Sequence, residues 1–159
     1  MPWRCWKFIL VKKMAVIYKT YSELITLPTY KQRLEYLLLY GKVGDMTFGS
    51  SRYLNQTLYK SDEWKEFREE IIIRDFGCDL GIQGRKIFEY ATVHHINPIT
   101  IEDVINRNPC VFDKDNVILV SDKTHKIIHY AFSLDGIEDD DIVVRKPNDT
   151  RLWWRRNYV

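Results

Sequence analysis

The sequence predicts an α+β fold in which helices surround a short two-stranded unit. Residues 91–132 read as a strand, a long connection, a second strand and a helix, and residues 61–74 carry large apolar side chains at helical spacing. The chain has 159 residues, of which 45% are hydrophobic, and this is enough to bury the core of one domain. We divide it into a basic, partly helical region (1–60), a core (61–132) and a C-terminal extension (133–159).

Two helical segments are expected within residues 20–41. Pro28 can occupy the first turn of the second segment, where its missing N–H breaks no helical hydrogen bond. The leucines that follow form part of an apolar stripe, and Gly41 is a natural stop. Residues 42–60 have mixed character, with glycines that mark turns, and we expect them to form loop on a basic surface or to contact nucleic acid.

A well-marked helix is expected to begin after Ser61, a good N-cap residue, and to end at about Arg74. Trp64, Phe67 and Ile71 share one face of this helix at helical spacing. We therefore interpret all three, including the tryptophan, as packing residues rather than binding residues.

Three strands are expected next. Residues 78–82 and 86–90 would be short strands around the Gln83-Gly84-Arg85 turn. A further strand, residues 91–96, is rich in strand-forming side chains and breaks at Asn97-Pro98.

The rest of the unit consists of a short helix, a strand and a longer helix. A capping box beginning at Thr100 opens a helix that should end at about Asn106. Residues 117–120 form an apolar strand, and Ser121 caps a helix expected to run to about Phe132.

All four histidines of the chain lie in this unit. They form an adjacent pair, His94 and His95, and a second pair four residues apart, His125 and His129. Residues four apart on a helix share one face, so His125 and His129 can point at one metal ion. Adjacent side chains on a strand point to opposite faces, so only one of the first pair can join them.

We expect His94 to complete a three-imidazole metal site that keeps positions open for water and substrate, as catalytic sites do. His95 would lie beside the metal without binding it, and its ordinary pKa of about 6.5 suits a general base. Two alternatives are four unrelated histidines and a structural or regulatory zinc site. A structural zinc site more commonly uses cysteines, and the three cysteines here are isolated, without a CxxC pair: Cys5, Cys78 and Cys110.

The pattern of these residues, within residues 78–130, resembles the HNH endonuclease family. That family has a His-His or Asp-His pair ending one strand, an asparagine on the second strand, and further metal ligands on the following helix. Here the pair is His94-His95, the asparagine is Asn116, and the other two histidines complete an Asn-x8-His-x3-His spacing. The resemblance implies a ββα-metal (His-Me finger) core.

A looser resemblance links the chain to small HNH proteins encoded by tailed phages and prophages, often beside packaging genes. It rests on residues 53–55, 64–75, 78–81, 94–100 and 146–150. It implies a phage or prophage origin and a role with the terminase large subunit during DNA packaging. Many HNH proteins carry paired CxxC zinc ribbons that this chain lacks, so no structural zinc is expected.

The resemblance also implies a role for each residue of the motif. His94, His125 and His129 would hold one divalent ion. His95 would take a proton from the attacking water, and Asn116 would brace the hairpin and help to orient His95. The products would carry 5′-phosphate and 3′-hydroxyl ends. The ion stays open among magnesium, manganese, nickel and zinc, because imidazoles favour transition metals whereas magnesium is abundant in cells.

Positive charge is concentrated in the N-terminal part of the chain. Residues 1–60 contain ten Lys and Arg against three Asp and Glu, whereas residues 61–159 contain fourteen against nineteen. This asymmetry is compatible with binding DNA through one face. The candidate DNA contacts are basic side chains outside the motif: Arg52, Lys60, Arg74, Arg85, Lys86, Arg155 and Arg156.

The scattered cysteines favour a reducing cytoplasm, that of a bacterial host if the chain is phage-encoded. No apolar run reaches the roughly 18 residues of a membrane span, so no membrane contact is expected. Met14 is a candidate alternative start, because the chain reads as an ordinary soluble protein from there. Two other functions stay open: a restriction or mobile-element HNH nuclease, and a non-catalytic metal-containing DNA-binding module. A module of that kind would need metal ligands but no base at His95.

Overall fold

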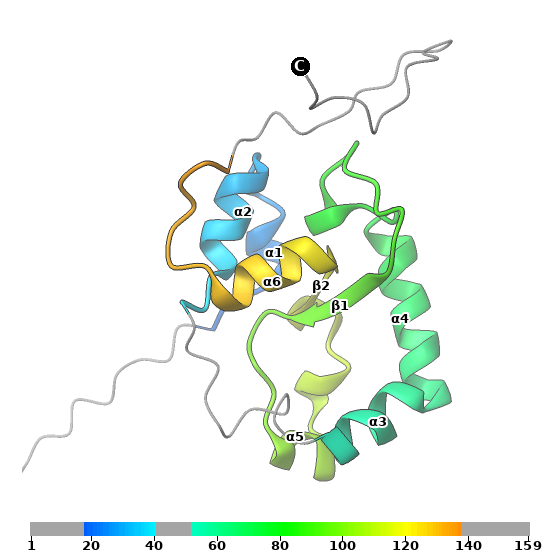
Figure 1. The fold of residues 1–159 in the computed structure, drawn as a ribbon. Helices are drawn as coiled ribbons and strands as arrows, with labels where there is room; N and C mark the ends of the chain where they lie inside the picture. The colour runs from blue at the N-terminus through cyan, green and yellow to red at the C-terminus, as the bar shows by residue number, and fades with distance from the viewer. Residues whose placement is uncertain (1–17, 41–51, 138–159) are drawn as a thin grey trace, which may run out of the picture.

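The computed structural model describes residues 18–40 and 52–137, with side chains from residue 56 onward in the second range (Figure 1). Within these residues it has mixed helices and strands, so the predicted α+β class is confirmed. The α-helices and strands are, in chain order, α1 (Tyr21–Leu24), α2 (Tyr30–Leu37), α3 (Arg52–Lys60), α4 (Asp62–Arg74), β1 (Ala91–His95), α5 (Ile101–Ile105), β2 (Val117–Ser121) and α6 (Asp122–Tyr130). The predicted features at residues 1–17 and 138–159, including the C-terminal basic and aromatic tail, lie outside the described residues.

The antiparallel hairpin of β1 and β2 is the centre of the fold, and helices cover both of its faces (Figure 1). Ile118 and Val120 pack with α2 and α6 residues in one apolar cluster, whereas Val117 and Leu119 pack with α4 residues in a second. These four residues of β2 are completely buried because each face of the strand meets a helical layer. In Figure 1, α1, α2 and α6 lie on one side of the hairpin and α4 on the other.

The register of the hairpin places His94 opposite Ile118 and His95 opposite Val117. The side chains of adjacent strand residues alternate, so His94 faces the α6 side and His95 faces the α4 side. The predicted strands at residues 91–96 and 117–120 are confirmed to within one residue at their ends.

Four helix starts or ends follow the predicted local signals. Ser61 caps α4 by accepting a hydrogen bond from the Trp64 N–H, and α4 ends at Arg74 as predicted. Ser121 caps α6 in the same way, and the capping box at Thr100 opens α5. Local hydrogen bonds of short side chains therefore decide where these helices begin.

Two predictions in the N-terminal part are wrong in detail. Pro28 does not lie in the first turn of α2, because Thr29 forms the N-cap and a capping box with Gln32. Residues 52–60, for which we expected a loop or a nucleic-acid contact and no helix, form α3. This stretch contains neither glycine nor proline, and Leu58 is buried against the α4 cluster, so nothing in it opposes a helix.

The predicted strand pair within residues 78–90 is also wrong. The segment has a single bridge between Cys78 and Lys86, and Asp79–Gly81 forms a short 3₁₀ turn. Leu80 has a left-handed backbone with φ of 52°, which a regular strand does not allow. The turn brings Asp79 under the N-terminus of α6, and that tertiary contact replaces strand pairing.

The buried carboxylate of Asp79 connects this turn to α6. It accepts hydrogen bonds from the Ser121 N–H (3.0 Å), the Ser121 hydroxyl (2.9 Å) and the Thr124 hydroxyl (2.5 Å). The carboxylate thus positions the first turn of the helix that carries His125 and His129.

We expect Asp79→Ala to lower the free energy of unfolding by about 3 kcal/mol, because it leaves the part-buried Ser121 N–H and the buried Thr124 hydroxyl without their charged acceptor. Chemical denaturation followed by circular dichroism measures this change. Asp122→Ala is the matched control: Asp122 lies in the same helical turn, but its carboxylate is exposed and forms an exposed ion pair with Lys126. Its loss should cost less than about 1 kcal/mol. Equal effects of the two variants would contradict the role given to Asp79.

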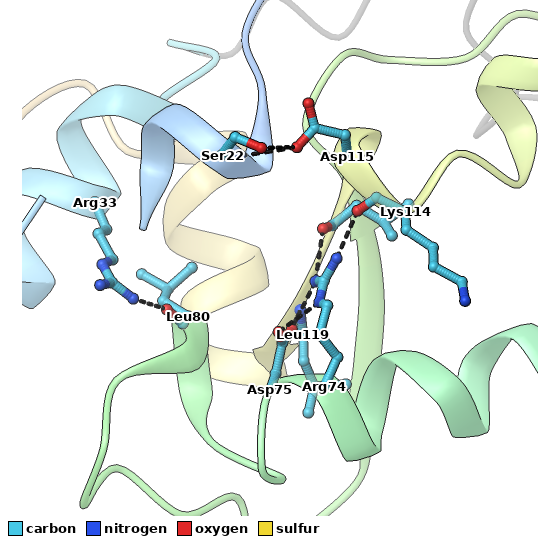
Figure 2. Close-up of polar contacts among 9 residues, drawn as sticks. Ser22, Arg33, Arg74, Asp75, Leu80, Lys114, Asp115 and Leu119 are labelled. Atoms are coloured by element: carbon cyan, nitrogen blue, oxygen red, sulfur yellow. Dashed lines mark hydrogen bonds and ion pairs between the residues drawn. The ribbon is translucent and has the colours of Figure 1, made fainter. Parts of the chain in front are cut away.

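A second buried carboxylate joins α4 to β2 (Figure 2). Asp75 accepts from the Leu119 N–H at 2.9 Å and from two nitrogens of Arg74 at 2.8 and 2.9 Å. The Arg74 guanidinium also donates to the Lys114 and Val117 carbonyls and lies 3.5 Å from the centre of the Tyr21 ring.

Across the described ranges, no helix is both long and apolar enough to cross a membrane.

Candidate metal centre and cleft

Three histidines from two elements meet at one end of the hairpin. His94 comes from β1, while His125 and His129 lie one turn apart on α6. The centre of the His94 ring lies 5.3 Å from the centre of the His125 ring and 5.2 Å from that of His129. The ring centres of His125 and His129 lie 4.5 Å apart. Strand alternation directs His94 toward α6, and the helical repeat aligns the other two.

The donor atoms of this cluster fit a metal ion. Each histidine offers one ring nitrogen, and the three nitrogens all lie within 4.8 Å of one another. The Nε2 atom of His94 is buried and has no hydrogen-bond partner among the described residues. A buried polar atom without a partner costs free energy, and a metal ligand position would satisfy it. Neutral imidazole is a common ligand for transition metals.

The protein environment favours the neutral form of all three rings. Burial lowers the pKa of His94 well below its usual value, and the neighbouring histidines lower it further. Burial also lowers the pKa of His125, with a smaller contribution from His129, and burial alone lowers the pKa of His129. Neutral rings keep the lone pairs that metal binding requires.

His95 lies on the other face of β1, held between a carbonyl and a tryptophan. Its Nε2 atom is 3.0 Å from the Val111 carbonyl oxygen, and its ring stacks on Trp64 with centroids 5.8 Å apart. A carbonyl oxygen only accepts, so Nε2 carries the proton and Nδ1 of the neutral ring is a free base. Burial lowers the pKa of His95, and the hydrogen bond to Val111 opposes that effect.

Asn116 braces the hairpin end through three hydrogen bonds. Its Oδ1 accepts from the N–H of Asn97 at 3.0 Å and from the Asn97 side chain at 2.7 Å, and its Nδ2 donates to the Cys110 carbonyl at 3.0 Å. The Cys110 carbonyl belongs to the same short 3₁₀ turn as the Val111 carbonyl that holds His95. Asn116 is thus linked to His95 through this turn rather than by direct contact.

Asn97 is a site residue that the sequence pattern did not identify. Beyond its bonds with Asn116, it accepts from the Lys19 N–H and donates to the Lys19 carbonyl. In the sequence it stands out only as the residue before Pro98, which indicated the end of a strand. Its bridging role depends on the segment before α1, 78 residues away along the chain.

A cleft of about 580 Å³ runs along β1 and contains all four histidines. Since β1 pairs only with β2 in the described sheet, its outer edge is open to the cleft, and side chains from both of its faces reach it. The other lining residues are mainly aromatic, apolar or basic: Leu39, Tyr59, Trp64, Lys65, Arg68, Tyr90, Ala91, Thr92, Val93, Pro98 and Ile99.

The predicted DNA-contact residues whose side chains the structure describes do not line the cleft. Arg74 binds Asp75 and the carbonyls of Lys114 and Val117. The Arg85 guanidinium lies 3.6 Å from the centre of the Tyr30 ring. The Lys86 ammonium donates to the Phe76 carbonyl. Lys60 ends α3 outside the cleft lining. The side chains of Arg52, Arg155 and Arg156 lie outside the described residues. Among the described residues, the lysine and arginine that line the cleft are instead Lys65 and Arg68. The sequence points to them only through Trp64, because Arg68 follows it by four residues on α4.

A comparison of the chain with protein-family models, with characterised proteins and with solved structures found no significant match.

Proposed function

We propose that this chain is a metal-dependent DNA endonuclease of the HNH type, with β1, β2 and α6 as its ββα-metal unit. One observation carries the proposal. The three-histidine cluster, with its unpartnered His94 nitrogen, shares a cleft with a fourth histidine whose orientation leaves Nδ1 as a base. A site that served only to bind a metal would have no use for a base oriented in this way.

His94, His125 and His129 would hold the ion. A divalent cation bound there would act as a Lewis acid on the oxygens of the scissile phosphate, where negative charge grows in the transition state. The donor set contains only imidazoles, so we expect manganese, nickel or zinc to bind more tightly than magnesium, which prefers oxygen ligands.

His95 would act as the general base. Its Nδ1 would accept a proton from the water that attacks phosphorus, while the bond from phosphorus to the 3′ oxygen breaks. The leaving 3′ oxygen would take a proton from solvent water, which gives 5′-phosphate and 3′-hydroxyl ends. The Val111 carbonyl keeps the ring in the required tautomer, and Trp64 covers one of its faces. Asn116 would hold the Val111 turn in place through the adjacent Cys110 carbonyl.

The test is plasmid cleavage by purified, metal-stripped protein. Supercoiled plasmid is incubated with magnesium, manganese, nickel or zinc added one at a time, and open-circle and linear products are separated on a gel. Metal-dependent cleavage supports the proposal, and the product ratio distinguishes nicking from double-strand cutting. Folded protein that binds metal and DNA but cleaves with no ion would favour the non-catalytic DNA-binding module instead.

A further inference from the structure

One wall of the cleft is built from residues outside the histidine motif. Lys65 and Arg68 come from α4, and Tyr90 immediately precedes β1. Arg68 donates to the Ala91 carbonyl at 2.8 Å, and its guanidinium lies 5.4 Å from the centre of the Tyr90 ring. The arginine is therefore held in place by the first residue of the strand that carries His94 and His95.

The cationic side chains and the exposed tyrosine ring of this wall suit a ligand that carries both a negative charge and an aromatic ring. Among the cleft-lining residues that the structure describes, none is an aspartate or glutamate. Beside them, the exposed Asp62 carboxylate pairs with the Lys65 ammonium at 2.7 Å, so Arg68 is the main cation that the wall offers to a phosphate. The hydrogen bond to Ala91 uses one of the five N–H donors of Arg68, and a planar guanidinium suits the oxygens of a phosphate. Tyr90 is 74% exposed although it is a large aromatic residue, so its ring offers a surface for stacking.

We infer that Arg68, Lys65 and Tyr90 form a nucleotide subsite for an unpaired DNA strand, in which Arg68 binds a phosphate and Tyr90 stacks on a base. The inference rests on the proposed nuclease function, because it places this strand in the cleft that contains the histidines. Ala91 precedes His94 by three residues, which is about 10 Å along a strand. The subsite would thus hold a nucleotide near the phosphate that is cleaved.

The stacking role decides between unpaired and paired DNA. In a duplex the faces of the bases are covered by their neighbours, so an exposed tyrosine can stack only on a base that is unpaired or flipped out. If the wall bound duplex DNA, Lys65 and Arg68 would contact phosphates and the ring of Tyr90 would contribute little. A preference for single strands that depends on Tyr90 is therefore the specific consequence of the subsite.

Fluorescence anisotropy with a labelled oligothymidylate, and with a duplex of equal length, tests the inference. Binding is measured on full-length His95→Gln protein with manganese, so that cleavage does not consume the probe. We expect the single strand to bind at least about fivefold more tightly than the duplex. Tyr90→Ala should weaken single-strand binding about tenfold and duplex binding less than about twofold.

The phosphate contact of Arg68 is tested separately, by the salt dependence of single-strand binding. Arg68→Ala should weaken single-strand binding and reduce the slope of log affinity against log salt by about 0.7, the value for one phosphate contact on a single strand. Arg68→Lys keeps the charge and should restore most of that slope, whereas a purely structural role of Arg68 would leave the slope unchanged. The matched controls are Phe76→Ala and Arg107→Ala, an exposed aromatic and an exposed arginine that do not line the cleft.

Equal affinity for the two probes, or a Tyr90→Ala protein that binds single strands like the Phe76→Ala control, would overturn the subsite. Plasmid cleavage by the protein with native His95 is scored separately. Cleavage without a Tyr90 effect rejects the subsite and keeps the nuclease. A Tyr90-dependent and Arg68-dependent preference for single strands without cleavage keeps the subsite and rejects the nuclease.

Discussion

His95→Gln should lower the rate of DNA cleavage by about a hundredfold to ten-thousandfold while the affinity for the metal stays nearly unchanged. Glutamine can still donate an N–H to the Val111 carbonyl, but it has no lone pair basic enough to accept a proton from water. His95 lies on the face of β1 opposite the three-histidine cluster, so its replacement leaves the metal ligands in place. Plasmid cleavage under single-turnover conditions and metal titration by calorimetry measure the two quantities.

Trp64→Phe is the control for the His95 experiment. It changes the ring that stacks on His95 without changing any nitrogen that could act as a base or ligand. We expect a loss of activity of less than about tenfold, because the Val111 carbonyl still orients the imidazole. A His95→Gln protein that binds metal weakly, but cleaves normally once metal is raised to saturation, would reverse the roles and place His95 among the ligands.

His94→Leu should abolish both cleavage and the stabilisation of the protein by metal. With wild type, a metal at a concentration 100 times its dissociation constant should raise the free energy of unfolding by about 2.7 kcal/mol. The leucine variant should show no such increase. In chelator, however, we expect this variant to be at least as stable as wild type, because leucine replaces a buried imidazole whose Nε2 has no partner in the described structure. Thermal unfolding with and without metal tests both statements.

His125→Ala is the matched variant. His125 is another member of the cluster but is only partly buried, so its removal should also reduce the response to metal without a gain of stability in chelator. A His94→Leu protein that is markedly less stable than wild type in chelator, and that still responds to metal, would show that His94 is an ordinary core residue. That result would also remove the main support for the nuclease.

Much of the histidine geometry could be predicted from the sequence because it depends on local repeats. Two histidines four apart on a helix must share a face, and two adjacent histidines on a strand must point apart. The helix starts at Ser61, Thr100 and Ser121 were equally local, since each cap is a hydrogen bond to a residue three positions later.

The segment before β1 could not be predicted in this way. Residues 78–90 contain strand-like apolar side chains, but Asp79 bonds to Ser121 and Thr124, more than 40 residues away. Arg74 was likewise predicted to contact DNA, yet its partners are Asp75 and the backbone of the segment before and at the start of β2. Which charged groups become buried depends on partners that only the folded chain brings close.

The order of the residues is enough to predict that the four histidines form a strand pair and a helical pair and that helices frame them. Which side chains share the cleft with them depends on how the elements pack. Lys65 and Arg68 face it because α4 packs across the hairpin, and His95 keeps a free Nδ1 because the Val111 carbonyl occupies its other nitrogen. The physical reason is that repeats of 2 and 3.6 residues act within one element, whereas packing and long-range hydrogen bonds act between elements.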